Sequence, residues 1–182
     1  MTPRNDLLLL AGKIVTVIMQ VATGIGGATI AVVLPAFTFL RGDALEGFSD
    51  GSGITVADLP LVPTVALLAL LLAALAAMFV FFSRLRSIIA TVGSGDPFAP
   101  ANAERLSAMA WLFLGVQILQ WPATICAHIV AEAAREFDDF QLEVAGGDGF
   151  SLTGILMVIV LFILARVFRH GAAMREDLEG TV

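Results

Sequence analysis

Four long apolar segments alternate with shorter polar ones along the chain, at about residues 14–39, 61–82, 106–127 and 152–168. The second segment is the clearest, because it contains no charged side chain and a single hydroxyl group, on Thr64. At about 1.5 Å of rise per residue, a helix of this length reaches roughly 33 Å, enough to cross a hydrocarbon core of about 30 Å. A buried helix of a soluble domain rarely continues this far without a polar face. The pattern predicts an all-α membrane protein, a bundle of four transmembrane helices.

The polar segments between the spans predict three loops. Gly93–Pro100 contains two glycines and two prolines, so the helix that leaves the second span ends there. Arg41–Pro60 and His128–Phe150 are short acidic loops on the other side of the membrane. Phe140–Val144 alternates apolar and polar residues as a strand does, and we take Ile54–Val56 as its partner in a small hairpin-like cap.

The two ends of the chain are polar. Met1–Gly12 begins with a short polar tail, and the span after it is too long for the core of a signal peptide, so we expect an uncleaved helix. Ser151 is placed to cap the amino terminus of the fourth span. His170–Val182 is read as a short polar tail.

Composition supports the membrane class and narrows the chemistry. The chain is 58% hydrophobic and 14% charged, with a mean hydropathy of +0.93, well above what a soluble domain of this length tolerates. A single cysteine, Cys126, excludes an internal disulfide framework and a multi-cysteine metal site. The few basic residues form no run, so we expect no direct binding to nucleic acid. No catalytic dyad or metal cluster is recognisable, and we expect no enzyme activity, cofactor or metal.

The distribution of lysine and arginine predicts the orientation in the membrane, because loops that carry these residues stay in the cytoplasm. Eight of the ten flank one side of the spans and two the other. We therefore expect a protein of the cell (cytoplasmic) membrane with both termini, the central loop 83–105 and the tail 169–182 inside. The eight are Arg4, Lys13, Arg84, Arg86, Arg105, Arg166, Arg169 and Arg175, and the two are Arg41 and Arg135.

One face of the third span is polar. Gln117, Gln120, Thr124 and His128 recur every three or four residues and so share a helix face. Inside a bilayer their amides need partners, and Gln20 on the first span is the candidate. We favour hydrogen bonds between helices over a solute path, because no charged residue lies deep in a span.

Small residues form stripes on the first two spans. Spacing of four residues lets two helix backbones approach closely, either within the bundle or between two copies of the chain. We favour packing within the bundle, with a homo-oligomer as the alternative. The stripes consist of Thr23, Gly27 and Ala31, of Gly24 and Ala28, and of Ala69, Ala73 and Ala77.

The central loop and the tail carry a resemblance. Gly95-Asp96-Pro97-Phe98, with Asn102 and Arg105 shortly after, resembles the cytoplasmic loop of the bacterial membrane family called domain of unknown function 2975. The segment from Phe168 to Val182 resembles the carboxyl terminus of that family. The resemblance implies a small protein with four membrane helices and no established activity. Members are often encoded beside a helix-turn-helix regulator, which implies such a regulator as a cytoplasmic partner.

Two hypotheses for the function follow. The first is a non-enzymatic accessory or regulatory membrane protein that presents the central loop and the tail to a partner. The second is a subunit of a small-solute transporter or channel that uses the polar face of the third span. A simpler reading of the tail stays open, in which it is a helix with its basic residues at the lipid surface and its acids held away from the lipid. The candidate docking residues are Asp96, Pro97, Phe98, Asn102, Arg105, Arg175, Glu176 and Asp177.

Overall fold

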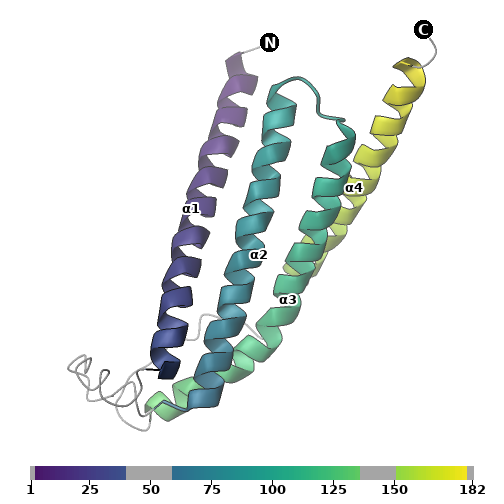
Figure 1. Cartoon of the computed structure of the whole chain (residues 1–182). Helices are drawn as coiled ribbons and strands as arrows, with labels where there is room; N and C mark the ends of the chain where they lie inside the picture. The colour runs from purple at the N-terminus through teal and green to yellow at the C-terminus, as the bar shows by residue number, and fades with distance from the viewer. Residues whose placement is uncertain (1–2, 40–58, 136–150, 180–182) are drawn as a thin grey trace. The chain divides into compact units, whose positions relative to one another are not determined.

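The fold consists of four long helices. The computed structural model describes residues 3–39, 59–135 and 151–179. Figure 1 shows the helices, each long and apolar enough to cross a membrane, and no strand lies within these ranges. The predicted all-α membrane fold is confirmed, while the predicted strand pair lies outside the described residues. The helices are α1 (Pro3–Phe39), α2 (Leu61–Gly93), α3 (Pro100–Arg135) and α4 (Leu152–Glu179).

The helices continue past the apolar segments. The polar ends that the sequence suggested as tails are helical, α1 from Pro3 and α4 as far as Glu179. Once a helix is nucleated, each further residue adds a backbone hydrogen bond, and the alanine, arginine and glutamate near the end of α4 are good helix formers. Pro35 and Pro122 lie inside helices, which is tolerated more readily in membrane helices than in soluble ones.

The helices divide into two compact units. The first unit contains Met1–Gly24, Ala76–Val116 and Leu152–Val182, so it includes all of α4. The second contains Ile25–Leu75 and Gln117–Ser151. The candidate docking residues all belong to the first unit.

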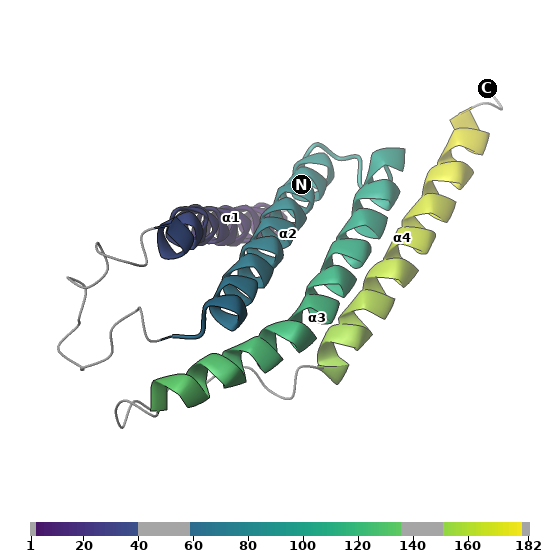
Figure 2. The same cartoon turned by 60° about the horizontal axis from the view of Figure 1, so that its bottom comes forward.

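The first unit has a core made by α2, α3 and α4. Figure 2 shows α4 alongside the first half of α3, as Figure 1 does. Phenylalanines from all three helices pack around this core, and Trp111 of α3 meets Phe162 of α4 edge to face at 5.4 Å. Lipid tails are as apolar as leucine, so close packing rather than escape from water holds such helices together. The buried core residues are Ile88, Leu106, Met109, Ala110, Leu161 and Ala165.

Glycines of α1 pack against α2 in both units. In the first unit, a Cβ atom on Gly24 would lie 3.3 Å from the ring of Phe79. In the second, a Cβ on Gly26 would lie 3.5 Å from Leu75, the side chain that Gly27 also faces. The glycines of the two α1 stripes, Gly24 and Gly27, thus pack within the chain, whereas Ala28 and Ala31 are exposed. On the α2 stripe, Ala69 and Ala73 are exposed as well.

Large apolar side chains cover the outside of the first unit. On α4, Leu156 is 61% exposed and Ile163 is 56% exposed, and on α1 Ile18 is 58% exposed. An apolar surface that follows whole helices is typical of contact with lipid. Together with the length of the helices, it identifies a multi-pass membrane protein.

One end of the first unit brings together three polar segments. Figure 1 shows the start of α1, the α2–α3 connection and the carboxyl end of α4 at this end. The candidate docking residues lie here, in the connection, in the first turns of α3 and in the last turns of α4. The fold therefore allows the central loop and the tail to meet.

Candidate functional site

The central loop begins with a capped helix end. Gly95 has a φ of 88°, a left-handed conformation that costs an L-residue about 1–2 kcal/mol. Its amide donates to the carbonyl of Val92, and the amide of Asp96 donates to the carbonyl of Thr91. These two bonds form a Schellman motif, which satisfies the last carbonyls of α2 and turns the chain toward α3. The glycine of the Gly95–Phe98 motif is therefore a helix cap.

The side chain of Asn102 holds the loop in place through hydrogen bonds. It lies in the first turns of α3 and is 0% exposed. Its Nδ2 donates to the carbonyl of Pro97 at 3.0 Å and to Oγ1 of Thr91 at 2.8 Å. Its Oδ1 accepts a hydrogen bond from Nη1 of Arg105 at 2.9 Å. The amide thus links the end of α2, the loop and the start of α3, and it fixes where the loop side chains point.

Phe98 projects from this loop onto α4. Its ring packs against Phe168, with ring centroids 5.5 Å apart. It also covers Gly171, where a Cβ atom would lie 2.6 Å from Cδ1 of Phe98. Real Cβ contacts essentially never come below 3.0 Å, so any larger residue at 171 has to displace the ring. Gly171 therefore forms a notch in α4 that admits the Phe98 ring.

An ion pair joins the same two segments farther along α4. Nη1 of Arg175 donates to Oδ1 of Asp96 at 2.5 Å, across 79 positions of sequence. The side chains are 51% and 41% exposed, respectively. An exposed pair of this kind contributes about 0.2–1 kcal/mol, so it orients the segments more than it binds them. We call the five residues Asp96, Phe98, Phe168, Gly171 and Arg175 the loop–α4 clasp.

The structure gives the candidate docking residues three different places. Asp96, Phe98 and Arg175 contact each other's segments in the clasp. Pro97, Asn102 and Arg105 hold the loop in shape through the hydrogen bonds of the Asn102 amide. The remaining two, Glu176 and Asp177, are exposed on the last turns of α4.

Two residues of the clasp escaped the sequence reasoning. Phe168 and Gly171 lay in the segment that carries the family resemblance, but neither was chosen as a site residue. Gly171 offered a signal, because an isolated glycine inside a helix costs about 1 kcal/mol relative to alanine and often has a packing reason. Its partner, Phe98, could not be inferred from local pattern.

The polar face of the third span is not uniformly buried. Gln117 is 5% exposed, whereas Gln120 and His128 are exposed. The hydroxyl of Thr124 donates to the carbonyl of Gln120 at 2.9 Å, so it is satisfied by its own helix. Gln20 is half-buried and belongs to the first unit, while Gln117 belongs to the second. Their pairing stays a prediction.

Metal-binding side chains do not gather in the described part of the chain. Among residues 3–39, 59–135 and 151–179, no group of three or more histidine, cysteine, aspartate or glutamate residues could hold an ion. Cys126 is a free, partly buried thiol. The acidic residues between 136 and 150 lie outside the described residues. The expectation of no enzyme activity, cofactor or metal stays a prediction.

Comparison with known proteins gives one match. No curated protein and no solved structure matches the chain. The model of a family described as "Protein of unknown function (DUF2975)" matches residues 9–182. That range contains all four helices almost entirely and every residue of the loop–α4 clasp. The match confirms the resemblance seen in the loop and the tail, and the chain belongs to the DUF2975 family.

Proposed function

We propose that the protein is a non-enzymatic accessory or regulatory membrane protein that presents its central loop and the end of α4 to a cytoplasmic partner. The loop–α4 clasp carries this proposal. It joins two segments that are distant in sequence into one surface, through the Asp96–Arg175 ion pair and the Phe98 ring in the Gly171 notch. The clasp builds a defined polar surface at the end of the first unit.

The orientation that we propose places this surface in the cytoplasm. Exposed arginines lie on α2 and α4 a short distance before the residues of the clasp. They are Arg84 and Arg86 on α2 and Arg166 and Arg169 on α4. Arg169 precedes the notch by two residues, or about 3 Å of helix, and Arg166 by five, or about 7.5 Å. Basic residues so placed beside membrane spans favour the cytoplasmic side. Both termini and the central loop then lie on the cytoplasmic side of the cell membrane.

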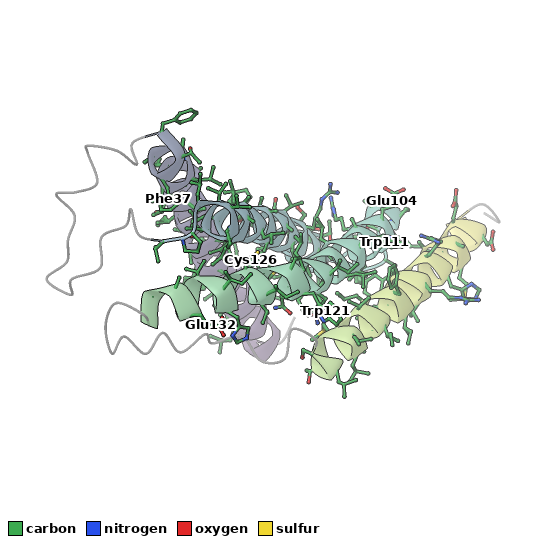
Figure 3. All side chains as sticks on the ribbon, turned by 90° about the horizontal axis from the view of Figure 1, so that it is seen from below. Phe37, Glu104, Trp111, Trp121, Cys126 and Glu132 are labelled. Atoms are coloured by element: carbon green, nitrogen blue, oxygen red, sulfur yellow. The ribbon has the colours of Figure 1, made fainter. Side chains whose placement is uncertain are left out.

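Charge suggests the kind of partner. Glu104 near the start of α3 and Glu176 and Asp177 near the end of α4 are exposed, and Figure 3 shows Glu104 extending away from its helix. Carboxylates at this end favour a protein partner with basic side chains and oppose direct contact with nucleic acid phosphates. A helix-turn-helix regulator, which carries basic residues for its DNA, fits this chemistry.

The test is capture of the candidate regulator encoded beside the gene by the intact protein in native-lipid nanodiscs. Charge reversal of Glu176 and Asp177 to lysine should weaken capture at least fivefold. The control is Glu132→Lys, which changes an exposed acid near the opposite end of α3 and should leave capture unchanged. Equal capture by all three proteins, or capture by none, would refute the proposal.

A solute-conducting subunit is the second candidate. Gln117 favours it, because a side chain that is 5% exposed on a membrane helix places an amide inside the protein. On this reading the amide of Gln117 contacts the solute, with Gln120, Thr124 and His128 farther along the same helix face. Leucine at Gln117 and Gln120 would then abolish uptake of the solute in cells, whereas an accessory protein with leucine there keeps its partner.

A further inference from the structure

We propose that the loop–α4 clasp is a latch: the end of α4 beyond Arg169 leaves the central loop and returns to it while the membrane core stays packed. The structure contrasts two kinds of contact between the same elements. Core residues of α3 and α4 such as Met109 and Ala165 are 2% and 4% exposed. At the clasp, Phe98 is 42% exposed and Arg175 is 51% exposed. Regions with few buried contacts open locally before the core does.

The loop side of the latch is the fixed side. The Schellman motif at Gly95 and the buried amide of Asn102 satisfy the loop backbone without any help from α4. The loop therefore keeps its shape when α4 leaves. Asp96 and Phe98 are held in place as a preformed half of the contact.

The α4 side is the moving side. Beyond Gly171, residues 173–177 are all exposed, so these turns bury little surface against the rest of the unit. Glycine also has the greatest backbone freedom of any residue and weakens a helix interior. Gly171 thus serves twice, as the notch that admits Phe98 and as the position where α4 bends or frays most readily.

Opening changes what the end of the first unit displays. The notch at Gly171 leaves the Phe98 ring, which keeps Phe168 as its partner, and Asp96 and Arg175 no longer neutralise each other. An apolar patch flanked by opposite charges replaces a closed surface. Asp96 and Phe98 are among the residues that the sequence suggests for docking, so a partner that binds them competes with the chain's own α4. This last step rests on the proposed function, whereas the latch itself does not.

The test measures distances within the full-length protein in nanodiscs, in a Cys126→Ala background. Spin labels at Ser94 and Ala173, both exposed, report on the latch, and labels at Glu104 and Leu164, also exposed, report on the core of the same unit. Gly171→Leu should convert the latch distance to a longer, broader distribution and leave the core distance unchanged. Gly115→Leu is the matched control, because a Cβ atom on that helical glycine would meet nothing within 4 Å.

A milder change tests the equilibrium. Asp96→Asn removes the ion pair and should raise the ratio of open to closed protein about 1.5- to 5-fold, the range expected for an exposed pair. In wild-type protein, 1 M salt should act in the same direction, because salt screens exposed charges. The proposal is overturned if the Ser94–Ala173 distance stays the same with Gly171→Leu, with Asp96→Asn and in high salt. It is also overturned if the Glu104–Leu164 distance changes together with it.

The latch and the docking proposal fail in different ways. If the latch opens as expected but the regulator binds neither open nor closed protein, the proposed function fails and the latch stands. If the regulator binds but Gly171→Leu does not raise its affinity, competition between partner and α4 is refuted.

Discussion

Replacing Asn102 with alanine removes a side chain that touches the end of α2, the loop and the start of α3 together. Its hydrogen bonds to Pro97, Thr91 and Arg105 disappear. Two neutral bonds contribute about 0.5–1.5 kcal/mol each, and the bond from the guanidinium contributes about 1.5–3 kcal/mol. Because bonds within one network are not additive, we expect a loss of about 2–4 kcal/mol in the free energy of unfolding.

The loss should be large because the site is closed. Asn102 is 0% exposed, so water cannot easily replace the amide, and the carbonyl of Pro97 and the hydroxyl of Thr91 lose a partner. Asn102→Asp should be as harmful, since a carboxylate can accept from Arg105 but cannot donate to the Pro97 carbonyl.

The assay is reversible unfolding in mixed micelles, followed by the fluorescence of Trp111 and Trp121. Glu104→Ala is the control, because it changes an exposed residue half a turn further along the same helix and should shift stability by less than about 0.5 kcal/mol. A loss below about 0.5 kcal/mol for Asn102→Ala would refute the reasoning that this amide organises the loop.

Three further substitutions have expected outcomes in the same assay. Gly95→Ala should cost about 1–2 kcal/mol, because the φ of 88° at this position strains an L-residue. Gly93→Ala should be neutral or slightly stabilising, because a Cβ atom there meets nothing within 4 Å, and equal effects of the two changes would contradict the role of Gly95 as a helix cap. Asp96→Arg with Arg175→Asp should restore most of what either single change removes, and additive losses would show that the ion pair contributes nothing. Gln117→Leu should cost about 0.6 kcal/mol, the average for a hydrogen bond between membrane helices, and a loss above about 2 kcal/mol would reveal a stronger role for its amide.

The sequence predicted the spans because a membrane imposes a simple rule on composition. Residues 61–82 could hardly be anything but a spanning helix, and the two glycines and two prolines of Gly93–Pro100 had to end it. The polar ends were harder. Nothing in hydropathy says whether α4 continues as a helix beyond Phe168, since a polar helix and a polar tail have the same composition.

Contacts between distant residues were beyond local pattern. Helical spacing put Gln117 and Gln120 on one face, yet the first is buried and the second exposed, because burial depends on which neighbour arrives there. The notch at Gly171 depends in the same way on Phe98, which the α2–α3 loop brings to it. The sequence suggested that the loop and the tail matter, and the structure shows how they touch.

Labelling of single cysteines in intact cells tests the central claim most directly, that the clasped loop and α4 end share the cytoplasmic side. Cysteines at Ser94 and Ala173 would be compared with cysteines at Gly51 and Gly147, using a maleimide that does not cross membranes. The account predicts that positions 51 and 147 react in intact cells and that positions 94 and 173 react only after the cells are opened. Labelling of Ser94 or Ala173 positions in intact cells would contradict it.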